Sequence, residues 1–200
     1  MQNINPHQAL FDNARFFIIK STNRENVEIS QKNSQWATTQ SNQKKLNEAF
    51  LNNYVILIFS VNKSSCYQGY AIMTSFISDK VSNIWQNESS VKLGGPFSVQ
   101  WLCQTDLPFV KVGNLSNPIN NNESIRNSRD TQELPKDIGS YICILCFEHE
   151  KGEAAYKIGK QQFIDEVAIQ KLTDEIKKNK ESNYKSMLYY FIILNDKALL

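Results

Sequence analysis

Four cysteines and two histidines are the residues of this 200-residue chain that are best suited to bind a metal. Cys143 and Cys146 form a C-x-x-C pair, which is half of a typical zinc site. Zinc requires four ligands, and the other candidates form no second pair: Cys66, Cys103, His7 and His149. We therefore expect buried thiols in an apolar helix, with no metal and no other cofactor.

The residues that catalysis would require show no recognisable pattern. The chain contains no G-x-S-x-G nucleophile turn, no phosphate-binding P-loop, no G-x-G-x-x-G and no H-E-x-x-H. Both histidines lie outside the predicted core, and carboxylates such as Asp106 and Asp130 have no evident partner in the sequence. These absences favour a binding module over an enzyme.

Two of the three tryptophans lie in predicted loops among polar residues. Trp101 is expected mid-strand in the core, whereas Trp36 and Trp85 are either partly buried anchors or flat surfaces for a ligand. Lys20 ends a predicted strand, and an Arg129–Asp130 pair lies in a later loop. Aromatic platforms beside scattered positive charge are typical of proteins that hold unstacked bases of single-stranded RNA.

The elements that must position these residues follow from the apolar spacing. The long Asn-rich segment 110–131 is unusual for a compact domain unless it is functional. After residue 148 the chain becomes charged and linker-like, and no internal repeat is present. Strands are expected at 14–20, 54–61, 66–75 and 97–105, with the second and third in a hairpin, and helices within 21–33, at 42–52 after a Ser41 cap, from 138 to 146 and from 163 to 176.

Composition sets outer limits on the function. The formal net charge of +2 neither indicates nor excludes nucleic-acid binding, and a 41% hydrophobic share is enough for one core. The longest apolar run, 187–194, is much shorter than the roughly 20 residues that cross a membrane. With no secretory signal expected at the N-terminus, the cysteines indicate a reduced, intracellular protein.

Several long motifs occur in order along residues 13–147. They read "ARFFIIKS", "QWATTQSNQKKLNEAF", "VILIFSVN" with "YQGYA", "GGPFSVQWL", "LPF" with "LSNP", and "SRDTQE". Together they resemble the YTH domain, a reader of N6-methyladenosine in RNA. The resemblance implies an α/β fold with a curved, barrel-like sheet of about six strands flanked by helices. We expect a flexible arm at 1–13, the domain at 14–147 and a helical extension at 148–200.

The resemblance also implies roles for individual residues. The walls of the cage around the methylated base fall on Trp36, Trp85 and Leu93, with Val91 as the alternative third wall. The base edge is read by the Asn26 amide and the backbone carbonyl of Ala37. The positions that line the pocket, contact the nucleoside or face the RNA backbone fall on Ser21, Thr22, Asn62, Asp130, Lys20 and Arg129.

The resemblance leaves the biological setting open. "WATTQSNQKKLNEAF" and "VILIFSVN" resemble YTH domains of polyadenylation factors and of nuclear splicing-associated readers, whereas "NSRDTQELP" resembles cytoplasmic readers. We expect a monomer that binds methylated single-stranded RNA, more in the nucleus than in the cytoplasm. Its protein partners would then belong to mRNA 3′-end processing or splicing, and no membrane is involved. The alternative is a protein-interaction module on the same fold that has lost RNA binding.

Overall fold

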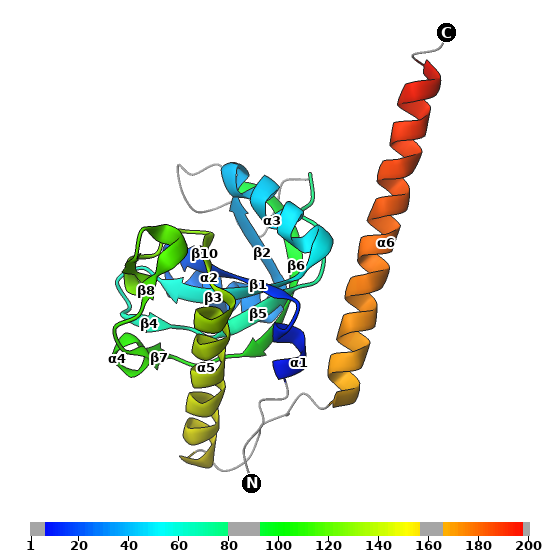
Figure 1. The fold of residues 1–200 in the computed structure, drawn as a ribbon. Coiled ribbons are helices and arrows are strands. Elements are labelled where there is room, and N and C mark those ends of the chain that lie inside the picture. Colours follow the sequence, from blue (N-terminus) through cyan, green and yellow to red (C-terminus); the bar gives the residue numbers. More distant parts are fainter. Residues whose placement is uncertain (1–6, 80–92, 157–165, 198–200) are drawn as a thin grey trace.

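The computed structural model describes residues 7–79, 93–156 and 166–197. A six-stranded, curled sheet with the strand order β10-β1-β3-β5-β6-β2 is flanked by helices, which confirms the expected α/β fold (Figure 1). The main elements are β1 (Ala14–Ser21), α2 (Arg24–Asn33), β2 (Gln35–Thr39), α3 (Gln40–Asn52), β3 (Tyr54–Val61), β5 (Tyr70–Met73), β6 (Leu93–Cys103), β10 (Gln132–Leu134), α5 (Lys136–Tyr156) and α6 (Glu166–Lys197). The short elements are α1 (Gln8–Phe11), β4 (Cys66–Tyr67), β7 (Leu107–Pro108), α4 (Phe109–Val112), β8 (Ser116–Asn117), η1 (Pro118–Asn120), β9 (Glu123–Ser124) and η2 (Ile125–Asn127).

Strands β1 and β3 are paired in parallel inside the sheet, from Ala14 opposite Tyr54 to Ser21 opposite Val61. Both are nearly continuous apolar runs, as expected for strands that are covered on both faces. A parallel register brings the carboxyl ends of the two strands to the same edge of the sheet. The residues that follow β1 and β3 are therefore neighbours in space.

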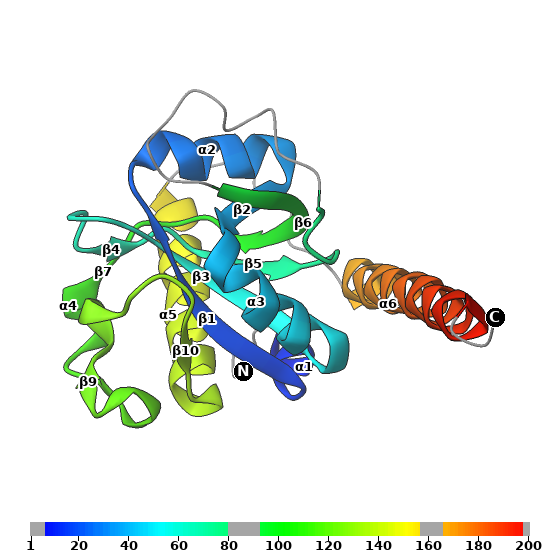
Figure 2. The ribbon, with the colours of Figure 1, turned by 90° about the horizontal axis from the view of Figure 1, so that it is seen from above.

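Helices α5 and α3 cover opposite faces of the sheet. Successive strand residues point to opposite faces. Phe16 meets Gly139 of α5, and the next residue, Phe17, lies under the ammonium group of Lys45 from α3, 5.5 Å from the ring centroid. Viewed from above, α2 lies beside β2 and β6 at one end of the sheet (Figure 2).

The predicted strands 14–20 and 54–61 are confirmed as β1 and β3. The prediction that Trp36 lies in a loop was wrong, because residues 35–39 form β2 against the start of β6. The reversal occurs at Ser34, which ends α2 in the left-handed conformation. Helix α3 also begins earlier than predicted, with Thr39 rather than Ser41 as its N-cap.

The predicted Asn-rich loop is largely irregular in the structure. It contains only the short elements α4, β8, η1, β9 and η2. Arg126 of η2 holds the loop together by donating from Nη2 to the carbonyl oxygens of Phe109 (3.2 Å) and Gly113 (2.7 Å). The hydrogen bonds of this arginine thus add to the few short regular elements that hold the segment.

Residues 7–13, the described part of the expected flexible arm at 1–13, are packed against the domain. Leu10 and Phe11 are fully buried, and α1 packs against β1 and α5. His7 was expected outside the core but is buried, with Nδ1 2.6 Å from the Tyr70 hydroxyl. An apolar pair, Leu10-Phe11, sits in this polar segment and could have indicated the docking.

The C-terminal helix α6 is longer than predicted and continues well beyond residue 176, where the predicted helix ends. Ile169, Leu172 and Ile176 are buried in the core cluster. Lys180 donates to the carbonyl of Asn53 at the end of α3 (2.8 Å). The red end of α6 projects beyond the rest of the fold (Figure 1). Within the described residues, no helix combines the length and apolar character that a bilayer crossing requires.

Gly139 tests the contact between α5 and the sheet. A Cβ at Gly139 would lie 2.3 Å from Cγ of Phe16, whereas a Cβ at Gly152 in the same helix meets nothing within 4 Å. We expect Gly139→Ala to lower the free energy of unfolding by about 1–3 kcal/mol through overpacking. Gly152→Ala is the matched control and should raise it by about 0.5–1 kcal/mol. Urea denaturation measures both, and equal effects would contradict this account.

His7 makes the stability of the fold depend on pH. Burial lowers the pKa of His7 from 6.5 to about 4. Between these values the unfolded chain binds a proton that the folded chain does not, so stability falls as the pH is lowered. We expect the free energy of unfolding to fall by up to about 3 kcal/mol between pH 6.5 and pH 4. In His7→Gln this fall should be smaller. Chemical denaturation across this range measures the slope, and an identical slope in His7→Gln would be the contrary result.

Candidate nucleic-acid interface

The parallel ends of β1 and β3 bring three of the predicted site residues together. The backbone N–H of Asn62 donates to the carbonyl of Ser21 (2.9 Å), which joins the last residue of β1 to the residue that follows β3. Lys20 is half-buried, and its Nζ donates to Oγ of Ser60 (3.1 Å). Burial lowers the pKa of Lys20, and the nearby charge of Asp130 partly opposes this.

Asp130 joins the long irregular segment to this edge. Its Oδ1 accepts from the backbone N–H of Lys20 (2.9 Å), and its Oδ2 accepts from Nδ2 of Asn42 (2.8 Å) and Oγ1 of Thr38 (3.3 Å). Burial raises the pKa of Asp130, and the hydrogen bonds oppose the shift. One carboxylate therefore connects β1, β2 and α3.

Trp36 is part of the core as well as part of the predicted site. Its residue is only 6% exposed, and its ring meets Phe59 edge-to-face with centroids 5.1 Å apart. Phe59 in turn stacks on Trp101 at 4.4 Å. The orientation of Trp36 is thus restricted by an aromatic row that joins β2, β3 and β6.

The carbonyl of Ala37 is directed by the strand pairing. The N–H of Val99 donates to the carbonyl of Ser34 (2.9 Å), so these two residues form a hydrogen-bonded pair. In an antiparallel ladder, hydrogen-bonded and non-bonded pairs alternate. Two residues further along β2, Trp36 and Phe97 therefore form the next hydrogen-bonded pair. Ala37, opposite Pro96, is then in a non-bonded pair. Because β2 is the edge strand among those described, the polar backbone groups of Ala37 point away from the sheet.

Asn26 lies in the first turn of α2. Asn23 caps this helix by accepting from the backbone N–H of Asn26 (2.9 Å). The Asn26 side chain is half-buried and donates from Nδ2 to Oγ1 of Thr22 (3.2 Å). Further along the helix, Ser30 accepts from the indole N–H of Trp101 (3.2 Å). The predicted residues Thr22 and Asn26 therefore contact each other directly.

The remaining predicted residues are less well connected. Leu93 is half-buried at the start of β6 and pairs with Thr39, at the end of β2. Arg129 is exposed beside Asp130. Trp85 and Val91 lie outside the described residues.

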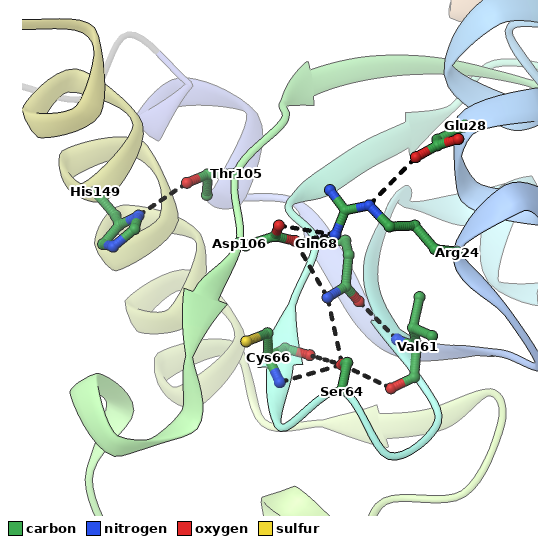
Figure 3. A network of polar contacts seen from close by, with 9 residues as sticks. All are labelled: Arg24, Glu28, Val61, Ser64, Cys66, Gln68, Thr105, Asp106 and His149. Atoms are coloured by element: carbon green, nitrogen blue, oxygen red, sulfur yellow. Dashed lines mark hydrogen bonds and ion pairs between the residues drawn. The ribbon is translucent and has the colours of Figure 1, made fainter. Parts of the chain in front are cut away.

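Sequence reasoning missed the residues that support the site. Asn42 and Lys45 look like surface residues of an amphipathic helix, yet Asn42 binds Asp130 and Lys45 donates to the carbonyl of Thr131 (2.8 Å). Arg24 and Asp106 form an ion pair that only the fold brings together (Figure 3). Their separation in sequence hides these contacts, and no local pattern indicates them.

The cysteines that suggested a zinc site are buried thiols. The four cysteines are free, and burial raises the pKa values of Cys103, Cys143 and Cys146. Raised pKa values disfavour the thiolate that binds metals. In the part of the chain that the structure describes, no three metal-ligating side chains gather at one point.

Comparisons with known proteins agree with this geometry. The profile of the YTH family, described as the YT521-B-like domain, matches residues 14–147, and the chain belongs to this family. Among curated relatives, "30-kDa cleavage and polyadenylation specificity factor 30" of Arabidopsis thaliana is 45% identical over 66% of this chain and 22% of its own length. "Methylated RNA-binding protein 1" of Saccharomyces cerevisiae is 37% identical over 70% of this chain and 46% of its own length. The chain thus spans less than half the length of either relative.

Solved structures give the same family. The Toxoplasma CPSF4 YTH domain in complex with a 7-mer m6A-modified RNA is 36% identical, with a TM-score of 0.65 over 68% of this chain and 93% of that one. The YTH domain of Zygosaccharomyces rouxii MRB1, in complex with N6-methyladenosine RNA, is 33% identical, with a TM-score of 0.60 over 67% of this chain and 87% of that one.

Asp130 tests how the site is assembled. In Asp130→Asn, an NH2 group replaces one of the two carboxylate oxygens. Both oxygens accept hydrogen bonds from the protein, so the NH2 group meets a donor whichever way the amide is turned. We expect a loss of about 1–3 kcal/mol in the free energy of unfolding by urea denaturation. Asp174→Asn, at an exposed position of α6, should change it by less than about 0.5 kcal/mol. Unchanged stability in Asp130→Asn would show that these contacts are not made in solution.

Proposed function

We propose that this chain binds single-stranded RNA carrying N6-methyladenosine. The observation that carries the proposal is the meeting of residues from separate segments at one edge of the sheet. Lys20 and Ser21 are the last two residues of β1, and Asn62 is the first residue after β3. Asp130 comes from the irregular segment. The two related YTH-domain structures described above, from Toxoplasma and Zygosaccharomyces rouxii, are complexes with methylated RNA.

The base would be held by stacking and apolar contact. Trp36, Trp85 and Leu93 are the proposed walls of the cage, and stacking of a base on an aromatic ring contributes about 1–3 kcal/mol. N6-methyladenine is neutral, so cation–π attraction is not involved. Burial of its methyl group adds about 0.8 kcal/mol, and more where an unmethylated base would leave a void. The preference for the methylated base should therefore be one to two orders of magnitude.

Polar groups would then read the edge of the base. The carbonyl of Ala37 is directed away from the sheet, where it can accept the remaining N6–H. The Asn26 amide can donate to a ring nitrogen, which an ionised carboxylate cannot do. Lys20 and Arg129 supply positive charge for the RNA backbone, and Ser21, Thr22, Asn62 and Asp130 complete the pocket.

The proposal also covers the setting of the domain. We propose a binding module rather than an enzyme, a monomer with its RNA-binding unit at 14–147, and a role in nuclear mRNA processing with 3′-end-processing or splicing partners. The polyadenylation relative supports this role. The alternative, a protein-interaction module without RNA binding, is disfavoured because Trp36, Trp85 and Asn26 are all retained.

RNA titration tests the proposal directly. A short single-stranded RNA with one N6-methyladenosine should bind at least about tenfold more tightly than its unmethylated twin. Trp85→Ala should weaken binding of the methylated RNA by about 1–3 kcal/mol, or roughly 5–150-fold. Fluorescence anisotropy measures these affinities. Equal affinity for the two RNAs would overturn the reader function.

Because Trp36 is also a core residue, its variants need a folding control. Trp36→Phe keeps a ring in the core but reduces the stacking area, so methylated RNA should bind more weakly while the domain still unfolds cooperatively. Tyr141→Ala, an exposed aromatic on α5, is the control for nonspecific loss and should leave the affinity unchanged.

A further inference from the structure

An ion pair joins the first turn of α2 to the segment that precedes β7. Arg24 Nη1 lies 2.8 and 2.7 Å from the two carboxylate oxygens of Asp106, which precedes β7 (Figure 3). Arg24 is two residues before Asn26, in the same helical turn. The partner thus comes from a distant part of the chain, whereas the contacts of Asn26 to Asn23 and Thr22 are local.

Asp106 is itself held by a buried amide. Gln68 is only 3% exposed, and its Nε2 lies 3.4 Å from Oδ1 of Asp106. The other end of the same amide, Oε1, accepts from the backbone N–H of Val61 (2.6 Å). Figure 3 shows this connection running from Arg24 through Asp106 and Gln68 to the end of β3. It links the start of α2 to the residue that precedes Asn62.

Two other positions of α2 are held by different contacts. Val27 is 2% exposed, and fully buried Ser30 accepts from the indole of Trp101. Trp101 belongs to β6, so the Arg24–Asp106 pair, which reaches the segment before β7, is a separate restraint on the first turn of the helix.

We propose that Arg24 and Asp106 are positioning residues that set the orientation of Asn26 toward the base. This inference rests on the proposed function. The side chains of the pair are 57% and 43% exposed, and exposed ion pairs contribute little to folding stability. Their main effect is therefore on the geometry of the first turn rather than on the stability of the domain.

A direct contact between Arg24 and an RNA phosphate is the competing explanation. The guanidinium already faces two carboxylates, Asp106 and Glu28, the latter 3.3 Å from Nε. These carboxylates raise the pKa of Arg24 and offset its charge, which makes it a weak phosphate ligand. The two explanations predict opposite effects for Asp106→Asn. Loss of that carboxylate would strengthen a phosphate contact but would weaken positioning.

The test uses RNA that lacks the ring acceptor. Methylated RNA and its 1-deaza analogue, in which the ring nitrogen N1 becomes C–H, are titrated against the wild type, Arg24→Gln, Asp106→Asn and the double variant. We expect about threefold to tenfold weaker binding of methylated RNA in each variant, and the double variant should lose no more than either single one. The loss of affinity that results from replacing N1 by C–H should be smaller in all three variants than in the wild type. Glu28→Gln is the control on the same helix and should bind like the wild type.

Three results would overturn the positioning role. These are tighter binding by Asp106→Asn, an unchanged effect of replacing N1 in the variants, or a log–log salt slope that falls by about 0.7 in Arg24→Gln. The free protein gives an independent measurement, since the side-chain NH2 resonances of Asn26 should shift in Asp106→Asn but not in Glu28→Gln. If the wild type ignores methylation while these resonances shift, the proposed function fails and the positioning of Asn26 stands.

Discussion

The site depends on the parallel pairing of β1 and β3. Their apolar runs are buried on both faces, so the register is strongly specified. That register sets Ser21 opposite Val61 at one edge, where the peptide N–H of Asn62 bonds to Ser21. The hydrophobic effect thus fixes the backbone from which the polar residues of the site extend. Their side chains therefore lie close together at this edge.

A second constraint closes the site from the other side. The segment that carries Arg129 and Asp130 has little regular structure, so hydrogen bonds must hold it. Asp130 accepts from β1, β2 and α3, and Arg126 ties the segment to the carbonyls of Phe109 and Gly113. Burial of a carboxylate is costly unless it is well bonded. The position of this segment is therefore narrowly defined, which suits the proposed pocket for one base.

The sequence predicted those parts of the molecule that depend on local pattern. The runs at 14–20 and 54–61 indicated β1 and β3 because apolar strand signals are strong and local. Trp36 was misplaced into a loop because the polar strand Gln35–Thr39 is stabilised by pairing with β6, which no local pattern reveals. The candidate site residues were assigned through resemblance to a family. Supports such as Asn42 and Gln68 were missed because their partners are distant in sequence.

Trp36 is a core residue and also a proposed wall of the cage. Its edge-to-face contact with Phe59 and the stacking of Phe59 on Trp101 restrict the ring before any ligand arrives. A wall that is already ordered loses little conformational entropy when a base stacks on it. The same row reaches α2, because the indole N–H of Trp101 donates to Ser30. Packing in the core therefore orients two elements of the proposed cage at once, the ring of Trp36 and the helix that carries Asn26.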